Sequence, residues 1–421
     1  QRSGDGLAGL SQTAMTAKRS SGTARGIRAN FPTIILLVFV LFFLFTARII
    51  YSPLLLDIEE SLGLGHAQAA SFFLFITVGY AGMMIFSGFV AAAIGHRNTI
   101  VLAVLIAVLG LIALSLSSTL WRMRASLILV GVGAGLYFPS GIPTLTALAD
   151  DRDEGKALAI HEVGPNLGFV LTPIGALFAL RYLNWQAVTF AVACIGAVAG
   201  VLFAIFARGG RFRGKPPHLA NARLILSKPS FWVMATLFAL GAGAAVGVFS
   251  MTPTYLATER GMNQELVNTL VSLSRLSSLG IIFVAGYLVD RFGARRVITV
   301  VMLTAGLATA AMGLAYRPLL IAAVFIQPIA TACFFPAGFT VVSRIAPRQM
   351  HNLTISFMSP IGYAVGSGLV PLFLGFLGDR LSFSFGFFIY GALLSASAVL
   401  PLFLKLEAGR SREPEKKNGS R

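Results

Sequence analysis

Blocks of about 20 apolar residues recur along this 421-residue chain and are separated by short polar segments. A block of that length crosses roughly 30 Å of hydrocarbon as an α-helix, whereas the strands of a membrane β-barrel are shorter and alternate in polarity. The sequence therefore predicts an all-α integral membrane protein with twelve transmembrane helices. The predicted spans lie near residues 31–55, 66–94, 99–118, 123–148, 155–180, 186–207, 231–256, 265–289, 296–315, 318–344, 352–377 and 383–405.

One polar segment, residues 208–230, is longer than the others and lies in the middle of the chain. It divides the spans into an N-terminal bundle of six helices, residues 31–207, and a C-terminal bundle of six helices, residues 231–405. The polar ends of the chain, residues 1–30 and 406–421, are expected to be disordered tails in the cytoplasm.

The two predicted bundles repeat each other in sequence. Tyr-Phe-Pro-Ser-Gly at residues 137–141 matches Phe-Phe-Pro-Ala-Gly at 334–338, an offset of 197 residues. Gly-x-Val at 88–90 matches Gly-x-Leu at 286–288, an offset of 198. A near-constant offset indicates two parallel, pseudo-symmetric repeats, which are related by an axis along the membrane normal and hold the solute site near the midplane between them.

Charge is sparse and unevenly placed along the chain. Only 12% of the residues are charged and 56% are hydrophobic, whereas soluble domains carry about 25% charged residues. The net charge of +17 does not require a nucleic-acid partner, because most Lys and Arg residues fall on one side of the predicted membrane when both termini are cytoplasmic. We therefore expect a multi-pass protein of a bacterial inner membrane, surrounded by the lipid bilayer and monomeric.

The sequence offers no sign of an enzyme. Cys194 and Cys333 lie far apart in apolar runs, so we interpret them as small core residues and not as a disulfide or metal site. The glycines of residues 131–135 follow no strand, so they predict close helix contacts and not a nucleotide loop. Neither a metal nor a cofactor is expected.

The most specific motif runs from Gly286 through Asp290, Arg291 and Gly293 to Arg295, between spans eight and nine. Its glycines allow a tight turn at a helix end, and Asp290 is placed to accept hydrogen bonds from arginines or from a neighbouring helix N-terminus. The motif resembles the cytoplasmic Gly-x-Leu-x-Asp-Arg-x-Gly-x-Arg-Arg signature of the major facilitator superfamily. This resemblance implies the major facilitator fold and assigns the five residues to a latch across the cytoplasmic gate.

The N-terminal copy of this motif departs from the pattern. Ala92 and Ala93 stand where Asp and Arg are expected, which leaves Gly95, His96 and Arg97. We expect unequal gates, with control depending more on the C-terminal copy and with Arg97 as the remaining gating residue of the N-terminal one. The alternative for each copy is a plain basic turn.

Few ionisable residues lie well inside the predicted spans, where each is costly. Arg48 is in span one, Arg275 is in span eight, and His161 and Glu162 are adjacent in span five. Two arginines against one glutamate predict a positive site that suits a carboxylate or phosphate. The alternatives are that Arg48 pairs with Glu162 and that the arginines cap helix carbonyls.

His161 and Glu162 are the candidates for proton coupling. A carboxyl group that moves between an apolar surrounding and a nearby arginine changes its proton affinity, and histidine titrates near neutral pH. Because adjacent helical residues point about 100° apart, we expect only one of the two to face the site. The alternatives are a packing role for His161 and a structural ion pair for Glu162.

Five further side chains are candidates for contact with the solute. Tyr137 and Phe335 belong to the repeated Pro-containing segments of spans four and ten, where proline allows the helix to bend. Asn166, Gln327 and Tyr363 are polar residues inside other spans. Ordinary helix packing is the alternative for each.

Arg48, followed by Tyr51 and Pro53, and the Gly-Pro-Asn-Leu-Gly stretch at residues 164–168 together resemble the organic-anion branches of the superfamily, including the anion:cation symporters. Arg275 resembles an arginine of monocarboxylate and oxalate carriers, whereas the paired glycines of nitrate carriers are absent. We predict a secondary transporter that moves a small organic anion, a carboxylate, by proton-coupled symport. Two alternatives stay open: a drug/proton antiporter, whose span-five signature residues 164–168 match in part, and a non-transporting membrane sensor.

Overall fold

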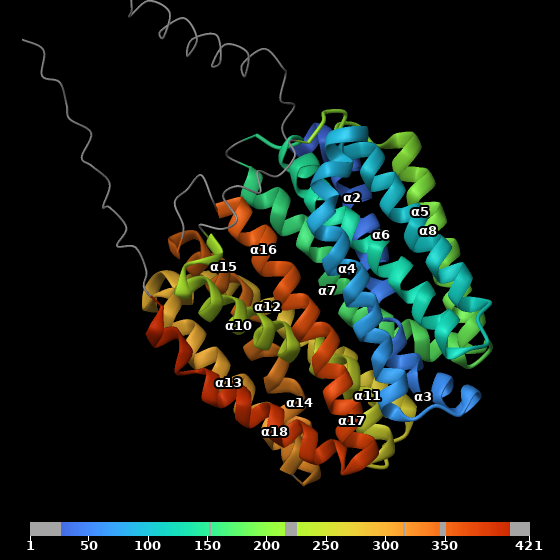
Figure 1. Cartoon of the computed structure of the whole chain (residues 1–421), viewed down its shortest axis with the longest axis vertical. Coiled ribbons are helices and arrows are strands. Elements are labelled where there is room, and N and C mark those ends of the chain that lie inside the picture. Colours follow the sequence, from blue (N-terminus) through green and yellow to red (C-terminus); the bar gives the residue numbers. More distant parts are fainter. Residues whose placement is uncertain (1–26, 151–152, 215–224, 315, 346–350, 405–421) are drawn as a thin grey trace, which may run out of the picture.

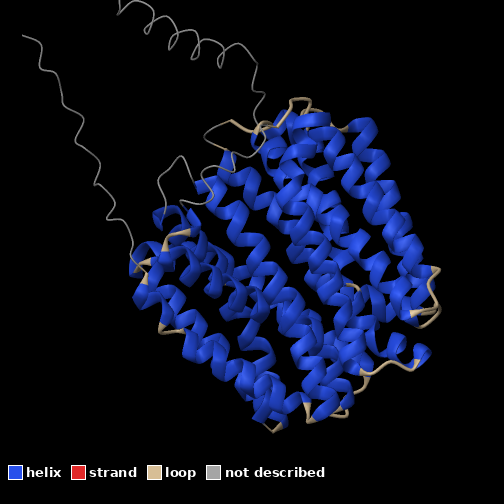
Figure 2. Ribbon diagram, viewed as in Figure 1, coloured by secondary structure: helices blue, strands red, loops and turns tan. Residues whose placement is uncertain are grey.

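The computed structural model describes residues 27–150, 153–214, 225–314, 316–345 and 351–404. These residues are almost entirely helical and contain no strand (Figure 2), which confirms the predicted all-α class. Residues 27–30 were expected to be disordered but form the first turn of a helix, in which Ile27 packs against the hydrophobic core. The rest of the predicted tails, residues 1–26 and 406–421, lies outside the described part.

The N-terminal bundle contains the first six spans. Its first span is broken at Ile50 into two helices, and each of the other five is one continuous helix. The bounds are α2 (Ile27–Ile49), α3 (Tyr51–Leu62), α4 (His66–Ile94), α5 (His96–Ser115), α6 (Leu120–Thr146), α7 (Glu154–Leu180) and α8 (Trp185–Phe206).

The C-terminal bundle is less regular. Two of its six spans contain a π-helical segment, and a third is broken at Cys333. In order, its elements are α10 (Pro229–Ala242), the π segment Gly243–Gly247, α11 (Val248–Thr258), α12 (Gln264–Phe292), α13 (Ala294–Leu314), α14 (Arg317–Ala332), α15 (Phe334–Ile345), α16 (His351–Tyr363), the π segment Ala364–Leu369, α17 (Val370–Arg380), α18 (Phe383–Ser397) and a 3₁₀ turn, Leu400–Phe403. Short π segments inside α-helices are frequent at functional sites.

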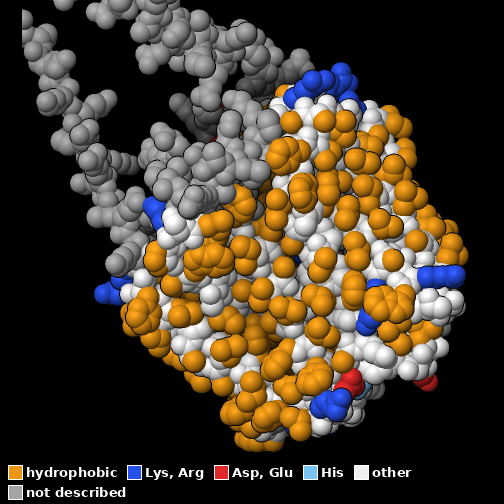
Figure 3. All heavy atoms as spheres, viewed as in Figure 1, with side chains coloured by type: hydrophobic (Ala, Val, Ile, Leu, Met, Phe, Trp, Pro, Cys, Tyr) orange, Lys and Arg blue, Asp and Glu red, His pale blue; other side chains and the backbone are white. Residues whose placement is uncertain are grey.

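The two bundles lie side by side (Figure 1). They meet where α12 packs against α7, where α4 packs against α16 and α17, and where α3 meets α11. Eleven helical segments of the described chain are long and apolar enough to cross a membrane, and α12, with 29 residues, reaches about 43 Å. Hydrophobic side chains cover most of the face in Figure 3, with charged groups mainly toward the helix ends. The predicted twelve spans in two six-helix bundles are therefore confirmed.

Glycine allows α4 and α6 to pack closely. A Cβ atom at Gly131 would lie 2.0 Å from the carbonyl oxygen of Ile76, and one at Gly79 would lie 2.2 Å from that of Ile128. Both distances are far below van der Waals contact, so any larger residue would force the helices apart. The glycine-rich stretch of span four therefore serves helix packing, as predicted.

The two ends of the molecule differ. We call the end that carries residues 208–214 the linker end, and the end that carries the turns at 63–65 and 259–263 the distal end. At the linker end, the backbone N–H of Arg97 donates to the carbonyl of Gly210 at 2.9 Å, and that of His96 donates to Phe212 at 3.2 Å. The first residues of the predicted linker are therefore docked on the N-terminal bundle.

Candidate functional site

The helix pair α3 and α11 joins the two bundles at a position fixed by the sequence repeat. The Ser52 hydroxyl in α3 donates hydrogen bonds to the carbonyl oxygens of Phe249 and Ser250 in α11, at 3.3 and 2.9 Å. Ser52 and Ser250 are 198 residues apart, which equals the repeat offset. The two helices therefore meet on the pseudo-two-fold axis.

Two further contacts between the bundles, which we call the distal clamps, lie at helix ends. Asp379, in the last turn of α17, turns its carboxylate to α4 and accepts hydrogen bonds from the backbone N–H groups of His66 and Ala67, both at 2.8 Å. The 198-residue offset relates Arg181 to Asp379 and Glu265 to Ala67. Arg181 and Glu265 form the second clamp, an ion pair of 2.9 Å. Among pairs in which both residues are described, hydrogen bonds between the bundles occur only from the α3–α11 crossing to the distal end. The bundles are held together at that end.

An aromatic cluster bridges the two bundles. Phe169 of α7 lies 4.7 Å from Phe45 of α2 and 4.9 Å from Phe249 of α11, measured between ring centroids, and both contacts are edge-to-face. This geometry is the favourable one for aromatic pairs. Because Phe249 comes from the C-terminal bundle, the cluster fills the interface between the bundles beside the α3–α11 crossing.

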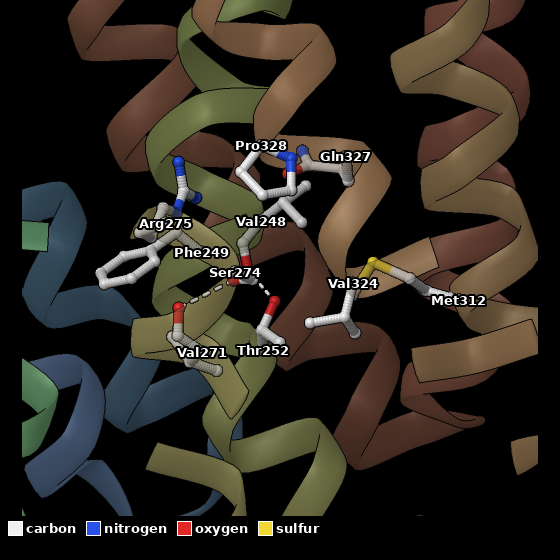
Figure 4. Close-up of a pocket in the computed structure, with 10 residues that line it drawn as sticks. All are labelled: Val248, Phe249, Thr252, Val271, Ser274, Arg275, Met312, Val324, Gln327 and Pro328. Atoms are coloured by element: carbon white, nitrogen blue, oxygen red, sulfur yellow. Dashed lines mark hydrogen bonds between the residues drawn. The ribbon is translucent and has the colours of Figure 1, made fainter. Parts of the chain in front are cut away.

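Arg275 of α12 packs on this aromatic cluster. Its guanidinium carbon lies 4.5 Å from the ring centroid of Phe169 and 4.7 Å from that of Phe249, and only 6% of the residue is exposed. Its Nη2 donates to the carbonyl of Ala245 in the first π segment at 2.8 Å, and Gln327 donates to the carbonyl of Ala244 at 2.6 Å. A cavity of about 10 Å³ lies between these side chains (Figure 4), which is space for about one water molecule.

Arg48 lies between the bundles near the end of α2. Its guanidinium carbon is 3.9 Å from the ring centroid of Tyr80 in α4 and 5.7 Å from that of Tyr363, the last residue of α16. The two tyrosine rings are nearly perpendicular, with centroids 5.7 Å apart. Within the described chain, Arg48 has no ion pair, and its buried Nε has no hydrogen-bond partner. Its charge is therefore stabilised by aromatic faces and left without an anion.

His161 and Glu162 differ in burial, although His161 Nδ1 lies 3.8 Å from Glu162 Oε1. His161 is fully buried, and its Nε2 lies 2.7 Å from the Tyr137 hydroxyl, which also donates to the carbonyl of Leu37. The Glu162 side chain is 54% exposed and is close enough to Tyr80, Tyr137 and Tyr363 to interact with them electrostatically. Glu162 is therefore the more accessible of the two side chains.

The remaining predicted contact residues are distributed unevenly. Asn166 donates to the backbone carbonyl of Glu162 at 2.8 Å, one turn earlier in its own helix. Phe335 instead joins a separate aromatic group, 5.5 Å from Phe334 and 6.2 Å from Phe238. Tyr137 is 1% exposed and its hydroxyl is occupied, so in this conformation it does not face the site.

We call Arg48, Tyr80, Glu162 and Tyr363 the arginine site. Sequence reasoning missed Tyr80, because nothing in the chain distinguishes it from other tyrosines until α4 and α2 are packed together. It also missed Phe169, which faces Arg275 from the other bundle. The spacing of residues in the sequence shows which of them share a face of one helix, but not which other helix packs against that face.

The chain matches the Major Facilitator Superfamily over residues 37–284 and 256–421. The protein belongs to this superfamily. A bacterial homologue of the human lysosomal transporter Spinster has the same fold, with a TM-score of 0.71 and 17% identity over 91% of this chain and 96% of that one. This facilitator is a membrane transporter and not an enzyme.

Relatives of this facilitator carry different solutes. The probable nitrate/nitrite transporter NarK2 of Mycobacterium tuberculosis is 25% identical over 358 residues, 82% of this chain and 87% of that protein. The probable sulfoacetate transporter SauU of Cupriavidus necator is 22% identical over 377 residues, with the same shares. The multidrug resistance protein MdtL of Klebsiella pneumoniae is 23% identical over 259 residues, 60% of this chain and 66% of that protein.

The facilitator's signature motif lies at the linker end, between α12 and α13. Gly293 makes the turn with a φ of 83°, a conformation that glycine adopts readily. Asp290 is exposed and has no hydrogen bond or ion pair with the described residues, whereas Arg295 donates to the carbonyl of Leu404 and Arg291 to the hydroxyl of Tyr287. The predicted latch contact of Asp290 is not formed with any of the described residues.

The N-terminal copy of the motif is arranged differently. Arg97 donates through Nη2 to the carbonyl of Ala204 at 2.8 Å, and its backbone is bound by the docked residues at Gly210. Linker residues 210–214 thus lie against the N-terminal motif, in which the acidic latch residue is missing. Gly286, the remaining motif residue of the C-terminal copy, is exposed.

Proposed function

We propose that this facilitator is a secondary carrier that moves a small organic anion, a carboxylate, by alternating access. The single observation that carries the proposal is the guanidinium of Arg48, held between the bundles by Tyr80 and Tyr363 without a carboxylate partner among the described residues. A charged group in such a place is expensive unless it is functional. An arriving carboxylate would receive two parallel N–H bonds from it.

The proposal also states which side of the membrane is closed in the described conformation. By the positive-inside rule, the linker end faces the cytoplasm, because it carries Arg97, Arg208, Arg211 and Arg213. The distal clamps then close the periplasmic side. The arginine site would exchange its anion with the cytoplasm in this state and with the periplasm after the clamps separate.

Glu162 is the proposed coupling group. Its carboxylate is close enough to Tyr80 and Tyr363 to interact with them electrostatically, so it would compete with a substrate carboxylate for the charge of Arg48. Protonation of Glu162 would favour anion binding, and departure of the anion would favour proton release. Glu162→Gln is therefore expected to retain anion exchange and to lose proton-driven accumulation in liposomes. Unchanged accumulation in that variant would remove Glu162 from the mechanism.

A binding screen tests the anion assignment. The purified protein is heated with monocarboxylates, dicarboxylates, sugar acids, sulfonates, phosphate, nitrate and cationic drugs, and the unfolding temperature is recorded for each. We expect stabilisation by one class of small carboxylates and its loss in Arg48→Gln. Arg275→Gln is screened in parallel, since Arg275 is the second arginine predicted to contact the anion. Stabilisation by cationic drugs alone would contradict the proposal.

Drug/proton antiport is the second candidate. The relative MdtL is named a multidrug resistance protein, and the aromatic cluster around Phe169 offers an apolar surface. Arg48, which has no carboxylate partner among the described residues, favours an anion instead, as does the similarity to SauU and NarK2 over a larger share of this chain. The cationic drugs in the binding screen separate the two candidates.

A further inference from the structure

A stripe of polar side chains follows one face of α12 from the distal end towards the bundle interface. Asn268, Ser272 and Arg275 are spaced four and three residues apart, which places them on the same side of the helix. The first two are fully buried, and Arg275 is 6% exposed. A helix that crosses a membrane would gain more from apolar residues at these positions.

The stripe faces α7 of the opposite bundle. Arg275, at one end, lies 4.5 Å from the ring centroid of Phe169 in α7. Glu265, one turn before Asn268, pairs with Arg181 directly after α7. These two contacts bracket Asn268 along the helix, so it lies on the line where α7 and α12 meet. We call this line the α7–α12 seam.

The polar groups on this seam are not satisfied in the described conformation. Neither the oxygen nor the nitrogen of the Asn268 amide has a hydrogen-bond partner among the described residues, and the same holds for the Ser272 hydroxyl. Buried polar groups without partners destabilise the state that contains them. Separation of α7 from α12 would expose them to water or to a polar solute, so they are suited to a state in which this seam is open.

The symmetry-related seam is built differently. By the 198-residue offset, the equivalents of the stripe are Ala70, Leu74 and Thr77 of α4, and they pack against span eleven. A Cβ atom at Gly375 would lie 2.7 Å from that of Ala70, and one at Gly368 would lie 2.1 Å from the Thr77 hydroxyl oxygen. Thr77 is satisfied by its own helix, since it donates to a carbonyl one turn earlier. This α4–α17 seam is closely packed and has no equivalent polar stripe.

We propose that the α7–α12 seam is the route by which the anion passes between the distal side and the interior, and that Asn268 and Ser272 form an anion subsite along it. An amide N–H₂ and a hydroxyl are neutral donors that can hold carboxylate oxygens. They bind less strongly than a guanidinium does, so they would pass the anion on to Arg275. This inference rests on the proposed function for the charge of the solute, but it can be tested without knowing the solute.

The test measures the access of charged thiol reagents from the distal side. The two native cysteines are removed by Cys194→Ser and Cys333→Ser, and single cysteines are introduced by Ser272→Cys and, as the matched control on the other seam, Leu74→Cys. Reconstituted full-length protein is treated with an anionic sulfonatoethyl thiosulfonate or a cationic trimethylammonioethyl thiosulfonate, both membrane-impermeant. Each rate is divided by the rate of the same reagent with a free thiol.

The Ser272→Cys variant is expected to react about tenfold faster with the anionic reagent, the size expected for one guanidinium roughly 10 Å away in a partly hydrated site. Arg275→Gln should abolish this preference and Arg275→Lys should keep it. The Leu74→Cys variant should show no preference. Gel filtration and labelling after denaturation establish that each variant is folded and carries its thiol.

Equal rates for the two reagents at Ser272→Cys would overturn the inference, as would a preference that survives Arg275→Gln or that also occurs at Leu74→Cys. Absence of reaction at Ser272→Cys would overturn it too, provided that Arg181→Ala, which removes the ion pair closing this seam, does not restore the reaction. A charge preference at Ser272→Cys with no anion binding in the thermal screen would leave the route standing and refute the proposed function instead.

Discussion

Removal of the Asp379 carboxylate should shift the protein away from the closed state, in which the two bundles are in contact at the distal end. Asp379 accepts two hydrogen bonds of 2.8 Å from the first N–H groups of α4, and the residue before that helix, Gly65, has no side chain to cap it. Asp379 therefore acts as a helix cap supplied by the opposite bundle. In the proposed alternating-access cycle, Asp379→Ala would weaken only the closed state, because the bundles would be separated at this end in the other state.

The free energy lost in Asp379→Ala can be estimated from the measured effects of removing helix caps. Loss of a side-chain cap costs about 0.5–2 kcal/mol, and loss of a negative charge at a helix N-terminus adds about 0.3–1 kcal/mol. Since Asp379 is exposed, we expect about 1–2 kcal/mol, which changes the ratio of closed to open protein by about 5- to 30-fold. The Arg181–Glu265 pair is also exposed, at 47% and 66%, and such pairs contribute only about 0.2–1 kcal/mol.

The shift can be measured by double electron–electron resonance. Spin labels at Leu116→Cys and Tyr316→Cys, exposed positions at the distal ends of the two bundles, report the distance between the bundles after Cys194→Ser and Cys333→Ser. Asp379→Ala should increase the long-distance population strongly, Asp379→Asn less, and Arg181→Ala least. An unchanged distance distribution in Asp379→Ala, or a larger effect of Arg181→Ala, would refute the reasoning.

Two further predictions concern packing and the gate. Gly79→Ala should destabilise the protein by about 1–3 kcal/mol, because the added methyl group overpacks α4 against α6. At Gly82 a Cβ atom would meet nothing within 4 Å, so Gly82→Ala should stabilise the protein by up to about 1 kcal/mol. Equal unfolding temperatures of the two variants would contradict this prediction. Asp290→Ala should slow transport more than Arg97→Ala, since only the C-terminal motif keeps its acidic residue. Unchanged transport in Asp290→Ala together with its loss in Arg97→Ala would show that the N-terminal copy dominates.

The architecture could be predicted because it depends on long, redundant patterns. Twelve apolar blocks and a repeat near 198 residues specify a two-bundle membrane protein, whatever any single residue does. The π segments Gly243–Gly247 and Ala364–Leu369 could not be predicted, because the widened turns depend on how spans seven and eleven pack together. A Cβ atom at Gly247, for example, would lie 2.7 Å from the carbonyl oxygen of Gly366.

The candidate site was predictable only in part. Arg48 and Arg275 stand out in sequence as charges within apolar spans, but their partners come from other helices and, for Tyr363 and Phe169, from the opposite bundle. The helical angle between His161 and Glu162 indicated that one would face away, but not which one. The contact of His161 with Tyr137, 24 residues earlier, becomes evident only when α6 and α7 are packed.

Transport by the Arg48→Gln variant tests the central claim most directly. The carboxylate that stabilises the purified protein is offered to proteoliposomes under a proton gradient, and its initial uptake is compared between the unmodified protein, Arg48→Gln and the packing control Gly82→Ala. We predict saturable uptake that Gly82→Ala retains and Arg48→Gln loses by at least about tenfold, as expected when a charge-assisted hydrogen bond of about 1.5–3 kcal/mol is removed. Uptake by Arg48→Gln at the unmodified rate would contradict the account.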